Sequence, residues 1–223
     1  YSTDVVAQHT FALALYLLEK LRYFDDYVKS GEYSRSRLFC HYGEKFRELA
    51  GKTWGIIGLG AIGSRVAQIA EAFGCRVIYY STTGKHTSSR YERVDWETLL
   101  RTSDVVSVHA PLTPQTEGIM NYEAFRRMKP SALFINVGRG PIVKEEDLAR
   151  ALKEELIAGA GLDVMTKEPL PADSPLLDIQ DSRKLLITPH IAWASVEARR
   201  RLIQELALNL EAWMRGEKRN RIV

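Results

Sequence analysis

A single stretch, TWGIIGLGAIG at residues 53–63, indicates how this chain folds. Its first half is an apolar run with the length of a buried strand, its second half reads GxGxxG, and a helical pattern over 61–73 follows. In that order Gly58 permits a tight turn, Gly60 lets the backbone approach a ligand closely, and Gly63 lets helix and strand pack together. The stretch therefore predicts a strand, a turn and a helix whose N-terminus is open to a ligand.

Apolar runs and helical patterns alternate along the chain on the C-terminal side of this stretch. The expected strands are 54–59, 76–80, 105–109, 133–137, 158–164 and 185–188, and the expected helices between them are 61–73, 96–101, 122–129 and 145–154. This alternation predicts an α/β fold, a doubly wound parallel sheet (Rossmann) in three layers, with an N-terminal and a C-terminal linking helix.

Two longer helices flank this core. The first is expected from Ser2 or Thr3 to Phe24 and is apolar almost all round over 11–18, so it needs cover on two sides. The last is expected over 193–215, and its stripe of four large apolar side chains is expected to face a core: Leu202, Leu206, Leu210 and Trp213. The adjacent Arg199, Arg200 and Arg201 are interpreted as a solvated face, and the polar segment 31–50 as a solvated connection.

The composition excludes several classes of protein. The 223 residues carry 31 basic and 28 acidic side chains, a net charge of +3, and no concentrated basic stripe, so nucleic acid is not an expected partner. The apolar run 11–18 is too short to span a bilayer, which needs about 20 residues, so no membrane partner is expected. Cys40 and Cys75 form neither a disulfide framework nor a CxxC metal pair, so we expect no metal site and a reducing, cytoplasmic location. The chain opens at Tyr1 without a methionine and is expected to be a piece of a longer protein.

The glycine-rich turn predicts a nicotinamide dinucleotide cofactor. The backbone amides of Ala61 and Ile62, at the positive end of the helix, would hold its pyrophosphate. Binding of NAD also calls for an acid at the end of the second strand, about 20 residues further on. That position instead reads STTGK, where Ser81, Thr82 and Lys85 offer hydroxyls and a cation. We therefore expect NAD(P), leaning towards NADP, with a merely solvated Lys85 as the alternative.

Three polar residues follow the ends of later strands, where open α/β sheets bind their ligands. Arg139 offers a planar fork for a substrate carboxylate, and His190 can give or take a proton near neutral pH. Glu168 could orient that imidazole and favour its protonated form. Each residue alone is also explained by a structural role, Arg139 as an ion-pair partner, His190 as a packed ring and Glu168 as a turn cap. Together they predict a site for hydride transfer coupled to proton transfer.

The sequence resembles the D-isomer-specific 2-hydroxyacid dehydrogenase family over nearly its whole length. The matching motifs are VAQHT (6–10), GIIGLG (55–60), HAPL (109–112), NVGRG (136–140), GAGLDV (159–164), EPL (168–170) and TPHIA (188–192). By this resemblance Arg139 binds the substrate carboxylate, His190 is the acid/base and Glu168 is its partner. The same resemblance assigns Ser81 to the adenosine ribose, Ala110, Pro111 and Thr116 to the adenine side, and Val137, Arg139 and Asp163 to the nicotinamide half. His190 is also expected to contact the cofactor.

Within this family, Trp193 after the His-Ile-Ala run is most similar to glycerate dehydrogenases, also called hydroxypyruvate reductases, although it could simply cover a helix start. The resemblance implies one dinucleotide-binding domain over 1–223, made of a linking helix (1–25), a Rossmann core (51–192) and a helix and tail (193–223). The substrate domain that precedes these parts in the family is largely absent. We therefore expect this fragment to bind cofactor but to turn over poorly.

Other functions stay open at this point. A formate or phosphite dehydrogenase shares the fold, but Glu168 argues against formate, whose enzymes usually carry glutamine there. The scaffold also resembles the C-terminal-binding corepressors, which sense a dinucleotide and dimerise, and a non-catalytic cofactor-binding fragment is a third possibility. Trp193 and the lack of a long disordered tail favour the metabolic enzyme. The apolar first helix suits a homodimer interface under either of the first two interpretations.

Overall fold

The computed structural model describes residues 1–85 and 87–221. Its sheet has seven strands: β1 (Thr53–Ile57), β2 (Arg76–Tyr80), β3 (Glu92–Arg93), β4 (Val105–Val108), β5 (Leu133–Asn136), β6 (Gly159–Leu162) and β7 (Leu185–Ile187). They lie in the order β3-β2-β1-β4-β5-β6-β7, and every neighbouring pair is parallel. The order reverses between β1 and β4, so the predicted doubly wound parallel sheet is confirmed.

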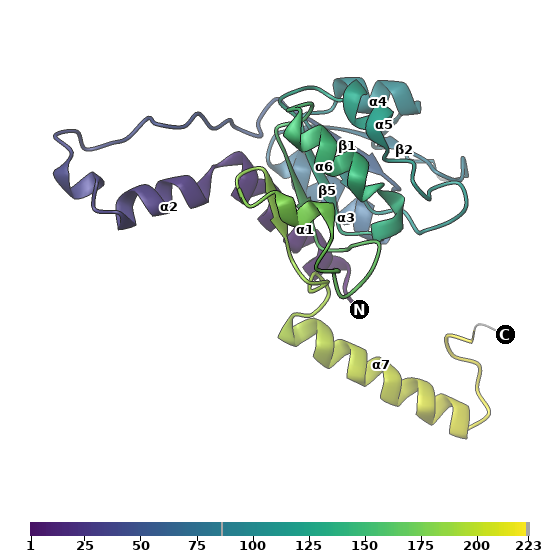
Figure 1. Cartoon of the computed structure of the whole chain (residues 1–223). Coiled ribbons are helices and arrows are strands. Elements are labelled where there is room, and N and C mark those ends of the chain that lie inside the picture. The colour runs from purple at the N-terminus through teal and green to yellow at the C-terminus, as the bar shows by residue number, and fades with distance from the viewer. Residues whose placement is uncertain (86, 222–223) are drawn as a thin grey trace.

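Helices cover both faces of the sheet, which gives the predicted three layers (Figure 1). One face packs against α4 (Trp96–Thr102), α5 (Tyr122–Arg127) and α6 (Glu145–Lys153). The other packs against α1 (Thr3–Leu18) and α3 (Ala61–Ala72). Because both faces are covered, β4, β5 and β6 are buried along their whole length, and apolar residues dominate them. The described residues also form three short 3-10 helices: η1 (Tyr33–Arg35), η2 (Gly140–Ile142) and η3 (Pro175–Asp178).

The strand boundaries follow the sequence pattern closely, with one omission. The prediction for β2 matches residue for residue, whereas β3 was not predicted at all. β3 consists of only Glu92 and Arg93, both exposed at the edge of the sheet. A two-residue polar strand has no apolar run or alternation to detect, and its pairing with Ile78 and Tyr79 of β2 defines it.

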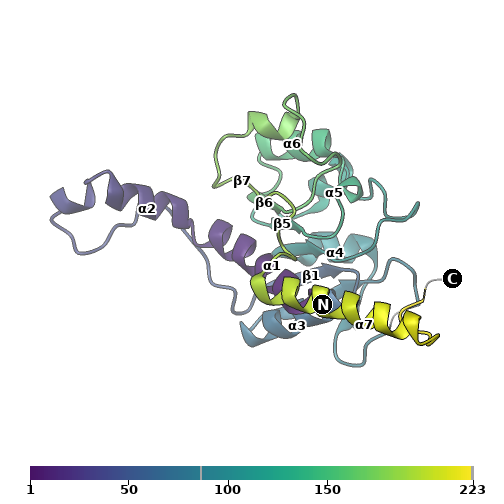
Figure 2. The same ribbon diagram turned by 90° about the horizontal axis from the view of Figure 1, so that it is seen from below.

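The first helix differs from the single helix that was predicted. Lys20 has a left-handed backbone with φ of 54°, and the chain there breaks into α1 and α2 (Leu21–Lys29). α1 is buried in the chain's own core, where it contacts α3, β5 and β6, whereas α2 buries none of its residues. α2 and the segment after it project from the body as an arm (Figures 1 and 2). The buried face of α1 already covers the sheet, so its apolar character is explained within the chain and the expected dimer interface on α1 stays a prediction.

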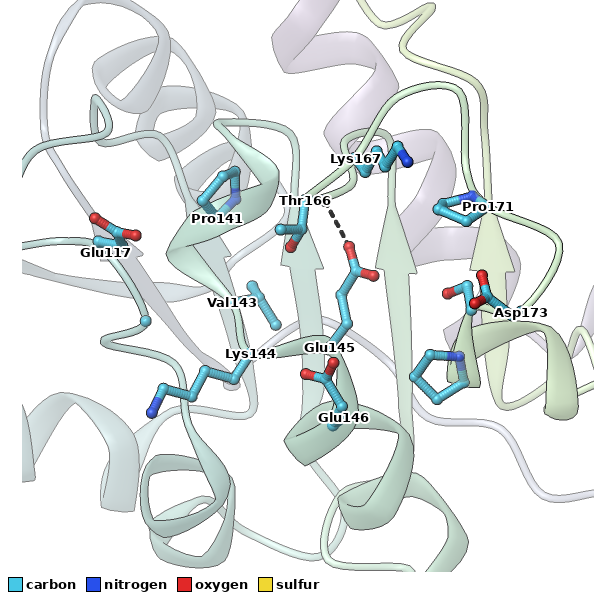
Figure 3. Close-up of a pocket in the computed structure, with 13 residues that line it drawn as sticks. Glu117, Pro141, Val143, Lys144, Glu145, Glu146, Thr166, Lys167, Pro171 and Asp173 are labelled. Atoms are coloured by element: carbon cyan, nitrogen blue, oxygen red, sulfur yellow. Dashed lines mark hydrogen bonds between the residues drawn. The ribbon is translucent and has the colours of Figure 1, made fainter.

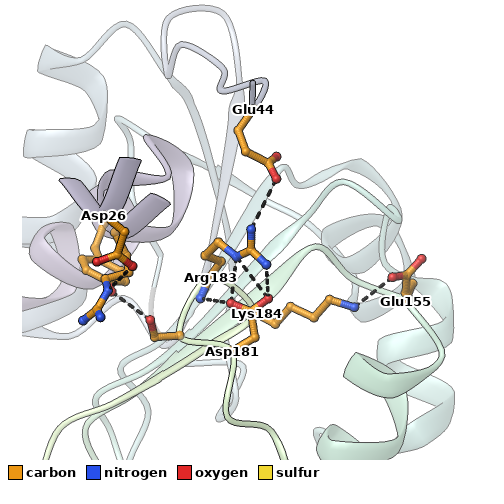
Figure 4. Close-up of polar contacts among 9 residues, drawn as sticks. Asp26, Glu44, Glu155, Asp181, Arg183 and Lys184 are labelled. Carbon is orange, nitrogen blue, oxygen red and sulfur yellow. Dashed lines mark hydrogen bonds and ion pairs between the residues drawn. The ribbon is translucent and has the colours of Figure 1, made fainter. Parts of the chain in front are cut away.

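The arm, which we define as residues 21–48, returns to the body through polar contacts. Arg183, in the body, lies between Asp181 and Glu44 of the arm (Figure 4). The neighbouring Lys184 pairs with Glu155 within the body, at a Nζ to Oε1 distance of 2.8 Å. The Arg183 Nη1 to Glu44 Oε1 distance is 3.5 Å, and both side chains are partly exposed. Exposed pairs of this kind stabilise a fold by about 0–1 kcal/mol, so the Arg183–Glu44 pair contributes little to holding the arm against the body. The segment 31–50 is mostly exposed, as predicted.

The last helix, α7 (Val196–Met214), stands away from the body (Figure 1). Most of its predicted core-facing stripe is instead open to solvent: Leu206, Leu210 and Trp213 are exposed by 50%, 63% and 77%, and Leu202 is half-buried. Ala198 and Ala212 are the buried residues of this helix. The prediction failed because the described chain supplies no surface against which the stripe could pack. The three consecutive arginines at the start of α7 are exposed, as predicted.

Candidate active site

The glycine-rich turn joins β1 to α3 at the carboxyl edge of the sheet. Gly58 has a φ of +92°, and a Cβ there would lie 2.8 Å from the backbone of Ala110. A Cβ on Gly63 would overlap the carbonyl oxygen of Gly58. Packing within the protein therefore explains why these two positions carry glycine.

Gly60 is different, because a Cβ there would meet no protein atom within 4 Å. Its φ of −81° is also open to any residue. Gly60 is the N-cap of α3, and no side chain caps this helix, so the first amides of the helix, at Ala61 and Ile62, are free to bind an anion. The empty space over uncapped amides fits the pyrophosphate of a dinucleotide.

The predicted cofactor residues in the segment after β2 differ in how accessible they are to a ligand. Ser81 is only 6% exposed, and its Oγ has no hydrogen-bond partner among the described residues. Thr82 is half-buried and Lys85 is exposed, so these two are accessible to a ligand. Arg93, which sequence reasoning missed, donates from Nη1 to the carbonyl oxygen of Gly84 at 2.9 Å and so steadies the turn. The contact could not be predicted from the sequence, because it depends on the pairing of β3, which carries Arg93, with β2.

The three predicted catalytic residues follow three adjacent strands. Arg139 comes after β5, Glu168 after β6 and His190 after β7, and β6 lies between the other two. The Nδ1 atom of His190 lies 2.7 Å from Oε2 of Glu168, while Oε1 of Glu168 accepts a hydrogen bond from the backbone N–H of Met165 at 2.9 Å. Burial opposes ionisation of Glu168, but these hydrogen bonds and the charge of Arg139 outweigh it and lower its pKa. The carboxylate is therefore ionised next to the imidazole.

A hollow of about 520 Å³ borders this pair. Apart from Glu168 and His190 its lining is apolar, formed by Met165, Pro169, Leu170, Ile187 and Pro189. The imidazole thus has a carboxylate on one ring nitrogen and an apolar wall beside it. Such a pair can hold a proton at a defined position and release it to a bound group.

The loop that carries Glu168 is anchored from α6. Glu145, in the first turn of α6, accepts a hydrogen bond from the backbone N–H of Thr166 at 2.5 Å (Figure 3). Around this bond lies an open hollow of about 410 Å³ with Lys144, Glu146 and Lys167 at its wall. The hollow includes none of the predicted catalytic residues, so we interpret Glu145 as a support for the loop.

The predicted cofactor residues after β4 and β5 lie near the same edge. Ala110 packs against Gly58, and Val137 is 8% exposed. Thr116 is buried, and its Oγ donates to the carbonyl oxygen of Pro111 at 2.8 Å and accepts from the N–H of Thr113 at 2.8 Å. The Thr116 hydroxyl thus stabilises its own loop through both of these hydrogen bonds.

Asp163 has a structural task that its predicted place near the nicotinamide did not suggest. It is fully buried, and its carboxylate accepts hydrogen bonds from the backbone N–H groups of Ile191 and Ala192 at 2.9 and 2.8 Å. It therefore holds the segment immediately after His190. Nothing in the local sequence around Asp163 reveals this link, because its partners lie 28 and 29 positions away.

One histidine near the switch point of the sheet was missed as a functional candidate. The Nε2 atom of His109 lies 3.0 Å from Oγ of Ser107, and that oxygen accepts a hydrogen bond from Nε1 of Trp54. Burial lowers the pKa of His109 to about 3, so the ring is neutral at physiological pH.

Across the described residues no group of three or more His, Cys, Asp or Glu side chains could hold a metal ion. None of the helices described is both long and apolar enough to cross a bilayer.

Comparison with known proteins places this geometry in context. Residues 11–192 match the profile of the family described as D-isomer specific 2-hydroxyacid dehydrogenase, NAD binding domain. A glycerate dehydrogenase from Methylorubrum extorquens is 38% identical over 220 residues, which cover 99% of this chain and 68% of that protein.

Two solved structures share the fold. An acyclic imino acid reductase in complex with NADPH and D-arginine superimposes with a TM-score of 0.88 at 34% identity, covering all of this chain and 69% of that one. A D-lactate dehydrogenase from Aquifex aeolicus, complexed with NAD and lactic acid, gives a TM-score of 0.87 at 32% identity, covering 97% of this chain and 68% of that one. The chain thus spans about two thirds of the length of these similar proteins.

Proposed function

Because this chain belongs to the D-isomer specific 2-hydroxyacid dehydrogenase family, we propose that it transfers a hydride between a nicotinamide cofactor and a small D-2-hydroxy acid or its 2-keto form. The observation that carries the proposal is the His190–Glu168 pair, which stands beside Arg139 on the same sheet edge as the uncapped start of α3. A fixed cation, a proton carrier and an anion-binding turn are what this reaction needs from a protein.

The proposed roles follow from which atoms remain available. Arg139 binds the substrate carboxylate through its exposed guanidinium, of which Nη1 also donates to the carbonyl oxygen of Gly138. His190 contacts Glu168 through Nδ1, which leaves Nε2 to give a proton to the C2 oxygen of a keto acid or to take it from a hydroxy acid. Glu168 positions His190 and stabilises its charged form. When bound, the nicotinamide supplies or accepts the hydride.

The proposed substrate pair is glycerate and hydroxypyruvate. Support comes from the 38% identity to a protein named glycerate dehydrogenase. Trp193 adds little to this choice, because its partly buried ring packs against the core on the α1 side.

We propose that the chain forms one dinucleotide-binding domain, with a core over 51–192 flanked by α1 and α7, and that it works with a substrate domain outside this chain. The exposed apolar stripe of α7 is the surface that such a domain would cover. Without it the site stays open to water, so the chain alone should bind cofactor but turn over poorly. The last two residues of the expected tail, Ile222 and Val223, lie outside the described residues.

We also propose a preference for NADP. The support is that residues 77–91 contain no acid, while Lys85 and Thr82 stand accessible after β2. A carboxylate there would repel the 2′-phosphate, whereas a cation attracts it.

Paired titrations of this chain with NADPH and NADH, followed by nicotinamide fluorescence, test the preference. We expect tighter binding of NADPH and, in Lys85→Glu, a loss of about tenfold or more for NADPH alone, because a charge-assisted hydrogen bond contributes about 1.5–3 kcal/mol. Lys52→Glu, before β1, is the matched control. If the parent binds NADPH and NADH equally and Lys85→Glu leaves the two affinities equal, the preference for NADP is contradicted. The proposed activity has its own test: the protein with its substrate domain should turn over hydroxypyruvate, and an absence of turnover would contradict it.

We propose that the chain forms a homodimer through its arm rather than through α1. Leu38, Phe39 and Tyr42 are exposed by 65%, 89% and 82% on a segment that stands off the body. Such a row of exposed apolar side chains is typical of a surface that a partner covers. Sedimentation analysis of a Phe39→Ser, Tyr42→Ser variant should give monomers where the parent gives dimers. A monomeric parent would contradict the proposed dimer.

We also propose a cytoplasmic location for the protein. The support is that both cysteines are free thiols, as is usual in a reducing compartment.

A further inference from the structure

A chain of hydrogen bonds links α1 to the loop that carries His190. The Nε2 atom of His9, on α1, lies 3.0 Å from Oγ1 of Thr188, and that oxygen lies 2.6 Å from Oδ1 of Asp163. The side chains of His9 and Asp163 are only 18% and 1% exposed. The link spans 179 positions of sequence between His9 and Thr188, so only the fold creates it.

The direction of each bond follows from the chemistry of the groups. The Thr188 hydroxyl has a single proton, which it donates to Oδ1 of Asp163 at 2.6 Å rather than to the more distant carbonyl oxygen of Leu162 at 3.5 Å. The Thr188 oxygen can then only accept from His9. His9 is therefore the tautomer with hydrogen on Nε2, and it donates into the chain.

Burial of His9 lowers its pKa, although the charge of Asp163 opposes this effect. The ring is therefore neutral at physiological pH. A neutral imidazole has one N–H donor, and Nε2 lies 3.0 Å from Oγ1 of Thr188 but 3.5 Å from Oδ1 of Asp163, so the nearer Thr188 takes that hydrogen bond.

The last member of this series of hydrogen bonds, Asp163, contacts the backbone of His190 and of the two residues after it. Asp163 accepts from the N–H groups of Ile191 and Ala192 through its carboxylate, and its carbonyl oxygen accepts from the N–H of His190 at 2.8 Å. His190 has a φ of +55°, in the left-handed region that a residue other than glycine adopts only at a cost. A backbone of this kind persists when its surroundings hold it from several directions.

We propose that His9 is a positioning residue for His190: by donating to Thr188 it fixes the Thr188–Asp163 pair, which keeps the His190 backbone left-handed and the imidazole against Glu168. This inference rests on the proposed function only in that His190 is the proton carrier. α1 thereby acts as part of the active-site support, in addition to covering the sheet.

The test compares two substitutions of His9 in the protein with its substrate domain. His9→Phe keeps a ring but removes the donor, whereas His9→Gln offers an amide N–H to Thr188. We expect His9→Phe to lower kcat by about 10- to 100-fold, as small misplacements of a reacting group do, with cofactor Kd changed by less than about twofold. His9→Gln should recover most of kcat. Gln8→Ala, on the exposed side of the same turn, is the matched control and should change neither quantity.

A double-mutant cycle with Thr188→Val isolates the hydrogen-bond chain. If His9 acts through Thr188, adding His9→Phe to Thr188→Val should lower kcat by less than about twofold more. Fully multiplicative losses would mean that His9 acts by another route, and an unchanged kcat in His9→Phe would overturn the proposal. Equal losses in His9→Phe and His9→Gln, or a matching loss of cofactor affinity, would also overturn it by showing a general packing role.

A spectroscopic measurement separates this proposal from the proposed activity. The ¹⁵N chemical shifts of the His190 ring, measured in protein labelled at histidine, should move in His9→Phe and stay near the parent values in His9→Gln and Gln8→Ala. If the parent protein shows no turnover, the proposed activity fails while these shifts still report the positioning. If the parent is active and the shifts do not move in His9→Phe, the positioning role fails and the activity stands.

Discussion

Replacing His190 with Gln should lower turnover by about 100- to 10,000-fold, the usual contribution of a positioned general acid or base, while cofactor affinity changes little. The reason lies in the geometry of the pair: Nδ1 of His190 is engaged by Glu168 at 2.7 Å, so Nε2 is the atom left to move the proton. Glutamine fills a similar volume but cannot carry a proton near neutral pH. The measurement is kcat in the protein with its substrate domain, together with cofactor Kd from nicotinamide fluorescence.

A second substitution separates proton transfer from backbone strain. Because His190 has a φ of +55°, glutamine there adds a backbone cost, whereas asparagine adopts this region more readily. His190→Asn should therefore lose as much turnover as His190→Gln while keeping more of the parent's thermal stability. His41→Gln, on the arm, is the control histidine and should leave turnover unchanged. Turnover near the parent value in His190→Asn, or equal losses of kcat and cofactor affinity, would remove His190 from the proposed role.

Replacing Gly60 with Val should abolish tight cofactor binding without destabilising the protein. A side chain at Gly60 meets no protein atom within 4 Å, and the φ of −81° suits any residue, so the melting temperature should stay within about 2 °C of the parent. The same side chain would occupy the space over the free amides of Ala61 and Ile62. Losing two charge-assisted hydrogen bonds, at about 1.5–3 kcal/mol each, weakens cofactor binding by about 100-fold or more.

Gly63 provides the contrasting variant in the same turn. A Cβ there would overlap the carbonyl oxygen of Gly58 and lie 3.3 Å from Cγ2 of Ile56, so Gly63→Ala should destabilise the fold by about 1–3 kcal/mol. Thermal melting and cofactor titration of the two variants check both expectations. Cofactor affinity that survives in Gly60→Val would show that the pyrophosphate does not approach this turn, and a large stability loss there would show that Gly60 is needed for packing.

The order of strands and helices could be predicted from the sequence because its signals are local. β2 was predicted residue for residue, since Arg76–Tyr80 is a short apolar run that follows the stop at Gly74. The break at Lys20 was not predicted, because neither glycine nor proline marks it. The exposed stripe of α7 was misjudged for another reason: amphipathicity shows that a surface needs cover but not whether this chain supplies it.

The site divides in the same way. Sequence pattern alone determined the glycine turn and located Arg139, Glu168 and His190 after successive strands, because parallel strands bring their carboxyl ends to one edge. Only the tertiary structure decided which atoms meet: Glu168 with Nδ1 of His190, Asp163 with the loop beyond it, and His9 with Thr188 across 179 positions. Such contacts depend on how helices and loops pack against the finished sheet, and that packing has no local signature, because each partner is chosen by its position in space rather than by its neighbours in the chain.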